Sequence, residues 1–535
     1  MKRWTGRSSE GLLLCVLAAL STWLFVASES AWYGDSTTYA ADIRGGRLIE
    51  PGHLLWRPLG RLVAVLPGPQ SYSAVLWKLQ FLCLLASVLA VVAMYRLAAR
   101  LYGRPGALVA AALMAVSNGF WSYAFSGCSY SLSMLFAIVA LHFAIAERGR
   151  SATGRSAFAA GAFGGLSAAS WSIQVLAAPA IWLALVLTSS RNATSLRSHL
   201  RNTALLAAGY LLTFVVPLLT GYVLETDRHA AAGKTLTFAQ WLASSGHGIP
   251  AHYGVAQLLR VCIGWPQSVI STSDVGSHLR LWRLHEAAFP HTAWLGVFVV
   301  FYAALAGGIW VLARGYARLD YRDRGVILAC AAALGINLLF AASWQGTDLE
   351  RYFPSWPFQL LLLALLVKVL ATAHPPRRLA LAAGAALAAL AVVNWYGTFA
   401  AVLASGSYRQ VWLRALRDAT SAKDLVILFG QRTQAIVSPH DPELPKIDNV
   451  SLEIEQRGEG WRAAELRNIM ATRQRGGRIF LSDTLFGTDS APRDGWSFRE
   501  YPQPTPSELQ AAFLPFKSDH IGFTVGTEKV WLGKE

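Results

Sequence analysis

The sequence predicts a mostly α-helical, polytopic membrane protein, with a bundle of about eleven transmembrane spans and a small α/β domain at its C-terminal end. Of the 535 residues, 54% are hydrophobic and only 15% are charged, whereas soluble domains carry about 25% charged residues. The stretch Leu76–Met94 contains a single charge, Lys78. The net charge is +16, and the basic residues gather at the ends of apolar stretches. This placement favours contact with membrane surfaces over nucleic-acid binding.

Apolar stretches bounded by charged or turn residues set the positions of the predicted spans. They lie near residues 11–28, 73–95, 105–122, 129–146, 156–171, 173–190, 203–224, 293–313, 325–343, 356–373 and 379–403. The region 156–190 is open to one long helix or two short ones, because it is rich in Gly and Ala. The first stretch resembles a signal peptide, but no small-residue cleavage site follows it, and we expect it to be retained as a span.

The distribution of Lys and Arg predicts the orientation of the bundle. If the N-terminus is cytoplasmic, the inner connections carry 19 basic residues. These are Lys2, Arg3, Arg7, Arg96, Arg100, Arg104, Arg148, Arg150, Arg155, Arg191, Arg197, Arg201, Arg314, Arg318, Arg322, Arg324, Lys368, Arg377 and Arg378. The three shortest outer connections contain only Arg351. The positive-inside rule therefore predicts a cytoplasmic N-terminus. The Ala- and Arg-rich composition is typical of bacteria, so we expect the bacterial inner (cytoplasmic) membrane.

This topology divides the chain into two domains. Residues 1–404 form the transmembrane domain, with long outer loops at 29–72 and 225–292, and residues 405–535 form an extracytoplasmic domain. In the latter, 424–430 and 478–483 are typical of short buried strands, and 460–475 is typical of a helix. We expect this α/β domain to act as a scaffold or substrate cover rather than as an independent catalyst.

The first outer loop carries acidic residues next to the first span. Asp35 lies at the expected membrane–water boundary, where a carboxylate can accept a proton from a hydroxyl nucleophile. Asp42 follows seven residues later, so a helix would place both acids on one face. The alternative for Asp35 is a structural one, in which it caps a helix that begins at Ser36. Downstream, the loop reads Gly52-His53-Leu54-Leu55-Trp56-Arg57-Pro58-Leu59.

A second motif lies between the ninth and tenth predicted spans, Glu350-Arg351-Tyr352-Phe353-Pro354. A guanidinium suits bidentate binding of phosphate and can stabilise charge on a leaving phosphate. Arg351 is therefore a candidate phosphate ligand at lipid headgroup depth. The alternatives are an Arg351 that pairs with Glu350, or one that extends its guanidinium to water from the interface.

The loop acid Asp35, the His53-containing motif and the Glu350–Pro354 motif resemble the membrane glycosyltransferases of the GT-C superfamily. The similarity is to the branch that contains protein mannosyltransferases and the lipid A aminoarabinose transferase. It covers the whole layout, from a first-loop acid through about eleven spans and a long outer loop to a terminal outer domain. Each motif is weakly specific alone, and their order and shared sidedness make the combination more specific.

The resemblance implies transfer of a sugar, a hexose or a pentose, from a polyprenyl-phosphate donor to a lipid, glycan or protein acceptor on the extracytoplasmic face, with inversion. It implies that Asp35 is the catalytic base, and that Arg351, with Tyr352 and Arg57, contacts the donor phosphate. Asp42, His53 and Glu350 are expected in the loops around the substrate. Many relatives carry two acids directly after the first span, whereas Ser36 follows Asp35 here. No cofactor is predicted, and a divalent metal is not favoured.

Other readings of the sequence concern metal binding and transport. The loop 225–292 contains His278 and His285 on one expected helical face, but Asp274 alone is close enough to complete a ligand set. Surface helices that cover the lipid donor are favoured there instead. A transporter or flippase of a lipid-linked glycan is the alternative function. Transporters usually place ionisable residues at mid-membrane and show repeated halves, and this sequence shows neither pattern.

Overall fold

The structure is a computed structural model that describes residues 2–27, 36–68, 72–145, 152–189, 196–231, 233, 235–243, 255–271, 291–343, 349–399, 408–429, 444–450, 454, 460–486, 505–525 and 528–534. The bundle consists of α1 (Lys2–Ala27), α4 (Tyr72–Tyr102), α5 (Arg104–Val116), α7 (Tyr130–Ala144), α8 (Gly154–Ser170), η1 (Ser172–Ala177), α9 (Ala178–Thr188), α10 (Leu196–Tyr210), η2 (Leu211–Val215), α11 (Val216–Ala231), α14 (His291–Gly315), η4 (Tyr316–Arg318), α15 (Tyr321–Ser343), α16 (Trp356–Ala373), α17 (Pro376–Asn394) and η6 (Trp395–Phe399). Shorter helices at one end are α2 (Ser36–Arg44), α3 (Trp56–Ala64), α6 (Asn118–Tyr123), α12 (Phe238–Ala243), α13 (Val255–Val269) and η5 (Leu349–Ser355).

Every predicted span coincides with a helical segment. Within the described part of the chain, seven helices are long and apolar enough to cross a membrane. The remaining four predicted spans correspond to α5, α7, α8 and η1–α9, which are 17 residues or shorter. The region 156–190 forms two helices, because the chain bends at Trp171 (φ −153°, ψ 112°). The chain is therefore a multi-pass membrane protein with the predicted fold class.

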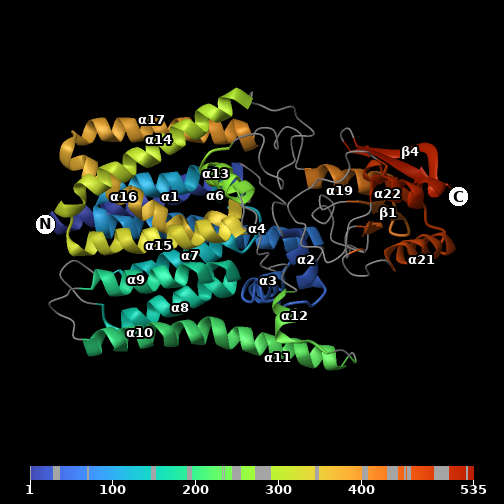
Figure 1. Cartoon of the computed structure of the whole chain (residues 1–535), viewed down its shortest axis with the longest axis horizontal. Helices are drawn as coiled ribbons and strands as arrows, with labels where there is room; N and C mark the ends of the chain where they lie inside the picture. Colours follow the sequence, from blue (N-terminus) through green and yellow to red (C-terminus); the bar gives the residue numbers. More distant parts are fainter. Residues whose placement is uncertain are drawn as a thin grey trace.

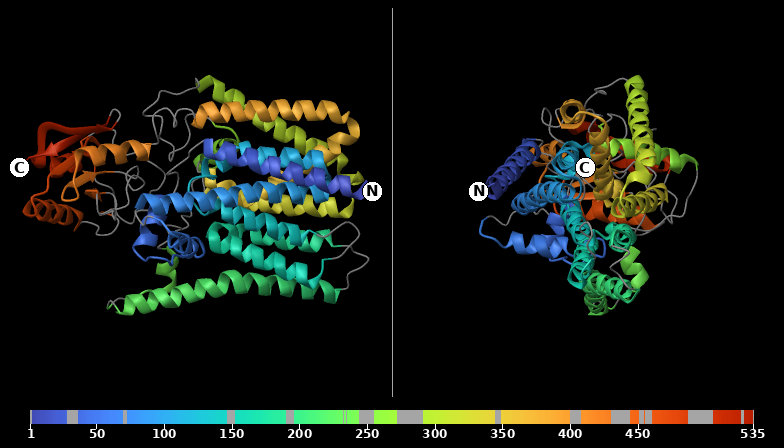
Figure 2. Two further views of the ribbon diagram at one scale, coloured as in Figure 1. Left: turned by 180° about the vertical axis from the view of Figure 1, so that it is seen from behind. Right: turned by 90° about the vertical axis from the view of Figure 1, so that its left-hand side faces the viewer.

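Burial shows which helices form the centre of the bundle. In the most apolar window of α4, 61% of residues are buried, whereas the corresponding windows of α14 and α17 are 0% and 6% buried. Figures 1 and 2 show α4 in the middle, with α14 and α17 along one side and α10–α11 along the other. Small residues allow close approach at the centre: a Cβ on Gly106 of α5 would lie 2.6 Å from the carbonyl oxygen of Ala364 in α16.

The short helices and the C-terminal domain lie at the end of the bundle opposite the N-terminus. The N-terminus lies at one end, together with the start of α10 (Figure 1). The helices α2, α3, α6, α12 and α13 and the C-terminal domain lie at or beyond the other end (Figures 1 and 2). The predicted loop 225–292 contains two of these helices, and α13 packs into the bundle rather than over it, since Trp265 and Ser268 are buried.

The C-terminal domain is a five-stranded mixed sheet with the order β2-β1-β3-β5-β4. The strands are β1 (Leu425–Leu428), β2 (Lys446–Asn449), β3 (Ile479–Ser482), β4 (Lys517–Val525) and β5 (Glu528–Gly533). Its helical elements are α19 (Tyr408–Ala419), α21 (Trp461–Gln474), η9 (Asp483–Leu485), α22 (Pro506–Phe513) and η10 (Leu514–Phe516). The strand β1 pairs in parallel with β2 and β3, and β5 runs antiparallel to β3 and β4.

Alternation along β1 explains why its residues are all buried. Leu425 and Ile427 pack with α21 and α22 on one face, and Val426 and Leu428 pack with α19 on the other. The predicted strands near 424–430 and 478–483 and the predicted helix 460–475 are thus confirmed as β1, β3 and α21.

Asp424 joins the starts of the two central strands. Its Oδ1 accepts a hydrogen bond from the backbone N–H of Arg478 at 2.7 Å, and its Oδ2 accepts from the Arg478 guanidinium and from the Ser421 N–H, both at 2.8 Å. Burial acts to raise the pKa of Asp424, but the hydrogen bonds from Arg478 and Ser421 outweigh burial and hold this pKa below its usual value.

This arrangement predicts an acid-sensitive C-terminal domain. Because the folded-state pKa of Asp424 is lowered, its contribution to stability is full above the unfolded-state value and is lost as pH falls through the folded-state value. We expect Asp424→Asn to destabilise the domain by about 1–3 kcal/mol at pH 7 and by much less in acid. Limited proteolysis of the domain in the full-length protein, at pH 7 and in acid, measures the effect. A variant that loses as much stability in acid as at pH 7 would contradict the prediction.

Candidate active site

The predicted first outer loop is fixed to the bundle by its backbone. The N–H of Leu55 donates to the carbonyl oxygen of Ala169 at 2.8 Å, and the N–H of Ser172 donates to the carbonyl oxygen of Gly52 at 2.9 Å. Both partners in the bundle flank the bend at Trp171, where the helical hydrogen-bond ladder between α8 and η1 is interrupted. The bend thus exposes backbone groups that the loop satisfies, and the loop motif Gly52–Leu55 is held against it.

His53 is the buried centre of this contact, with 4% of its surface exposed. Its Nδ1 lies 3.2 Å from the Ser170 carbonyl oxygen and 2.9 Å from the Ser129 hydroxyl, and its Nε2 lies 2.8 Å from the Tyr39 hydroxyl. A carbonyl can only accept, so a neutral imidazole with hydrogen on Nδ1 donates to Ser170 and accepts from Tyr39. His53 thereby ties α2 to both α7 and the α8–η1 bend.

Arg57 and Asp42 form a charged cluster beside His53. The Arg57 guanidinium lies 3.0 Å from a carboxylate oxygen of Asp42 and 3.6 Å from one of Glu50. It also lies over the ring of Tyr39, 5.7 Å from the centroid, and Arg47 approaches Asp42 at 3.6 Å. The role of Arg57 as a donor-phosphate ligand stays a prediction, and a phosphate that binds there would compete with two carboxylates.

The second motif is the buried turn η5, whose residues are all buried. Arg351 pairs with Glu350 at 2.8 Å, and the Tyr123 hydroxyl donates to the other carboxylate oxygen of Glu350 at 3.2 Å. Asn337 in α15 donates to the Arg351 carbonyl oxygen at 2.6 Å and accepts from the Ser355 hydroxyl at 2.6 Å. The ion-pair alternative for Arg351 is therefore observed, and its predicted contact with phosphate stays a prediction.

Tyr352, which follows this pair, contacts α13. Its ring is fully buried, and its hydroxyl donates to the Val261 carbonyl oxygen in α13 at 3.4 Å. In this structure Tyr352 connects η5 to α13, which brings part of the predicted outer loop 225–292 to the same motif, and its contact with a donor phosphate stays a prediction.

Aromatic side chains connect the two predicted motifs. The Tyr130 ring lies 6.4 Å from the ring of His53 and 4.8 Å from that of Tyr123. It also packs edge-on against Trp171 at 4.7 Å, and Phe353 lies 5.4 Å from Tyr123. The series His53–Tyr130–Tyr123–Glu350 thus joins residues that are about 300 positions apart in the sequence. The structure brings Tyr39, Asp42, His53 and Arg57 to one side of this series and Glu350 and Arg351 to the other.

Tyr123, Tyr130 and Trp171 were not predicted as site residues. They lie at or beside the short connections at the same end of the bundle as both motifs. An aromatic residue in such a connection is typical of a membrane interface, so its type alone does not separate a site residue from an anchor.

Asp35 lies outside the described residues. Ser36, which follows it, is the first residue of α2 and is buried. A Cβ placed on Gly127, between Tyr123 and Tyr130, would lie 3.3 Å from the Ser36 Cβ. The start of α2 therefore lies beside the aromatic series. Neither role of Asp35, as a base or as a helix cap, is tested.

No group of three His, Cys, Asp or Glu side chains that could hold a metal ion occurs among the described residues. His278 and His285 lie outside them. Two histidines of that predicted loop are described: His229 lies in α11 and contacts the Glu225 carbonyl oxygen through Nδ1 at 2.8 Å, and His291 is the first residue of α14.

A family model matches the middle of the transmembrane domain. The family of dolichyl-phosphate-mannose-protein mannosyltransferases matches residues 72–220, which include α4 to α10. No curated protein matches the sequence.

Solved structures match most of the chain. The crystal structure of ArnT from Cupriavidus metallidurans bound to undecaprenyl phosphate has a TM-score of 0.55 at 11% identity, and the match covers 98% of both chains. The apo form of the Archaeoglobus fulgidus oligosaccharyltransferase has a TM-score of 0.51 at 16% identity, over 89% of this chain and 70% of that one. The same oligosaccharyltransferase in complex with Zn and sulfate gives a TM-score of 0.52 at 14% identity, over 94% and 71%. The chain therefore has the fold of the GT-C membrane glycosyltransferases, as its motifs predicted.

Proposed function

We propose that the protein is an inverting glycosyltransferase that moves a sugar from a polyprenyl-phosphate donor to an acceptor on the extracytoplasmic face of the membrane. The observation that carries this proposal is that the first-loop motif and the Glu350–Arg351 turn lie close together, joined by aromatic side chains, at one end of a GT-C fold. The fold is shared over its full length with a protein that binds undecaprenyl phosphate. A lipid-carried donor also fits the expected face, since nucleotide sugars are cytoplasmic.

The proposed reaction is a single displacement. Asp35 accepts the proton of the acceptor's nucleophilic group as that group attacks the anomeric carbon. The bond between this carbon and the phosphate oxygen breaks, and the polyprenyl phosphate leaves with the electron pair. Arg351 stabilises the charge on the leaving phosphate in a largely desolvated site. Inversion follows because attack and departure occur on opposite faces of the sugar.

The proposal is tested with the purified full-length protein and a panel of polyprenyl-phosphate hexoses and pentoses, with release of polyprenyl phosphate as the readout. Substitution of Asp35 separates a base from a helix cap. Asn caps a helix about as well as Asp, but it cannot accept the proton. We expect Asp35→Asn to lower turnover by about 10²–10⁴-fold, with normal thermal stability and donor binding.

The control for this experiment is Asp35→Ala, which removes both the carboxylate and any cap. If Asp35 only caps α2, Asp35→Asn keeps near-normal turnover, and Asp35→Ala loses about 1 kcal/mol of stability. That pair of results would eliminate Asp35 as the base.

Arg351 requires a control for its ion pair with Glu350, because removing one partner of a buried pair leaves the other charge unpaired. We expect Arg351→Gln to raise the KM for the donor about thirtyfold or more, the equivalent of about 2 kcal/mol. Arg351→Lys should be impaired less, since it keeps the charge but loses the planar fork.

The matched variant is Glu350→Gln, which breaks the same ion pair and retains the guanidinium. If Arg351 binds phosphate, Glu350→Gln should lose less donor affinity than Arg351→Gln at similar thermal stability. Equal losses of donor affinity in the two variants would show that the ion pair, rather than a phosphate contact, explains the effect.

The orientation is a further part of the proposal. Ala422, in the turn before β1, and Ala373, at the end of α16, are both exposed and belong to opposite ends of the molecule. In a cysteine-free background in spheroplasts, Ala422→Cys should react with a membrane-impermeant thiol reagent. Ala373→Cys should react only after the membrane is permeabilised. The reverse pattern would place the candidate site in the cytoplasm and overturn the proposed donor.

A further inference from the structure

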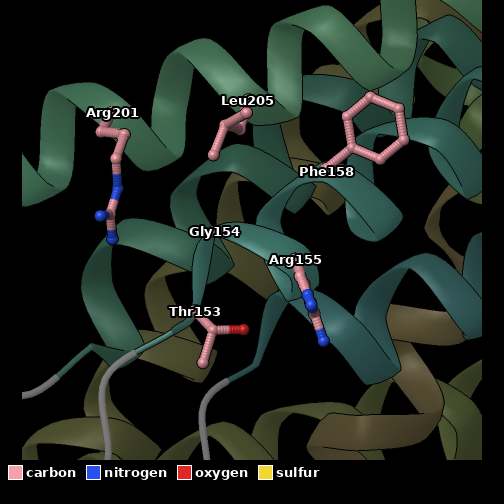
Figure 3. A pocket seen from close by; sticks show the side chains of 6 residues that line it. All are labelled: Thr153, Gly154, Arg155, Phe158, Arg201 and Leu205. Carbon is pink, nitrogen blue, oxygen red and sulfur yellow. The ribbon is translucent and has the colours of Figure 1, made fainter.

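A second candidate binding site lies at the opposite end of the bundle, between the starts of α8 and α10. A groove of about 620 Å³ occurs there. It is lined by Thr153, Gly154, Arg155, Phe158, Arg201 and Leu205 (Figure 3). None of the residues that the sequence motifs singled out lines this groove, so it is separate from the candidate active site.

Small residues account for the shape of the groove. Toward the middle of the membrane the two helices touch: a Cβ on Gly161 would collide with the Leu206 carbonyl oxygen, and one on Gly209 would collide with the backbone of Phe158. Such small residues permit close helix packing in membranes. At the end of the bundle, Asn202 holds the start of α8 through a 2.9 Å hydrogen bond to the Ala152 carbonyl oxygen. The groove lies where larger side chains separate the helices.

Two arginines give the groove its charge. Arg155 lies in the first turn of α8, whose start is capped by the Thr153 hydroxyl, and Arg201 lies in the second turn of α10. Figure 3 shows Arg201 extending from α10 toward Thr153 and Arg155 on the other side of Thr153. Both arginines are exposed, and neither forms an ion pair with another described residue. None of the six described lining residues is acidic.

Farther along both helices, beyond the two arginines, the lining of the groove is apolar (Figure 3) and continues onto the outer surface of the bundle. Phe158 is 38% exposed, and Leu205 lies one turn beyond Arg201. Farther along the same helix, Leu211 and Leu212 are 51% and 57% exposed. This helix lies at the perimeter of the bundle (Figure 2), so its exposed leucines face the lipid acyl chains.

We propose that this groove binds an anionic phospholipid of the surrounding leaflet, with its phosphate between Arg155 and Arg201 and an acyl chain along Phe158 and Leu205. Guanidinium groups bind phosphate oxygens in bidentate geometry. Basic pockets between transmembrane helices are suited to anionic headgroups at the membrane surface. A phospholipid with two phosphates can contact both arginines at once. Phe158 and Leu205 also offer an apolar contact to an acyl chain, which a free phosphate ion does not have.

Native mass spectrometry of the delipidated full-length protein in detergent tests the proposal. Cardiolipin, phosphatidylglycerol, phosphatidylcholine and undecaprenyl phosphate are titrated separately, and inorganic phosphate is added as a competitor. We expect cardiolipin and phosphatidylglycerol to bind more tightly than phosphatidylcholine. The double variant R155Q/R201Q should bind cardiolipin about thirtyfold more weakly, since each basic contact with an anionic headgroup contributes about a factor of five.

Two further variants distinguish binding in the groove from nonspecific attraction to basic residues. R377Q/R378Q removes two exposed arginines of α17 at the same end of the bundle, and it should bind cardiolipin as the unmodified protein does. Leu205→Trp keeps both arginines but fills the groove, and it should weaken binding. Equal weakening in both double variants would indicate nonspecific attraction and overturn the proposal. Unchanged binding in R155Q/R201Q, displacement by millimolar inorganic phosphate, or a preference for undecaprenyl phosphate would overturn it as well.

Discussion

The candidate site depends on the contact between the first outer loop and the bend that separates α8 from η1. Two backbone hydrogen bonds join Gly52 and Leu55 to this bend, and His53 fills the space between them with polar contacts on both ring nitrogens. A buried imidazole with unsatisfied nitrogens would be costly. These contacts therefore fix the position of the loop. The loop in turn fixes the position of α2, from its start at Ser36, and that of the Asp42–Arg57 pair.

The Glu350–Arg351 turn is held in a complementary way. Its charges are buried, and a buried ion pair needs further hydrogen bonds. Tyr123 donates one to the Glu350 carboxylate, and Asn337 holds the Arg351 backbone through its carbonyl oxygen. A pair of this kind keeps the guanidinium at a fixed depth, which is what the proposed contact with a donor phosphate requires. Fixed charges in a desolvated site need little reorganisation when new charge develops.

The fold could be predicted from the sequence because its strongest signals are local. A span needs about 20 apolar residues, and the strands β1 and β3 are short apolar stretches with polar ends. The site could be predicted only in part. The sequence singled out Asp42, His53, Arg57, Glu350 and Arg351 as candidates, and their roles stay predictions. It did not single out Tyr123, which contacts Glu350 across 227 positions. No periodicity connects such a pair. The carboxylate partners of Arg57 were likewise unforeseen, because which acid folds toward which base depends on the turn between α2 and α3.

The helix formed by α10, η2 and α11 is 36 residues long. At about 1.5 Å per residue it extends roughly 54 Å, against a hydrocarbon thickness of about 30 Å. Its far part stands beside the first outer loop, where Gly221 approaches Ile49 and Leu54, and Trp241 of α12 completes the same cluster. One side of that loop thus packs against a single continuous helix. Inserting one residue into this helix would rotate the side chains that contact the loop by about 100° and move them by about 1.5 Å along the helix axis. The length of the helix therefore determines how far from the bilayer centre the loop is held.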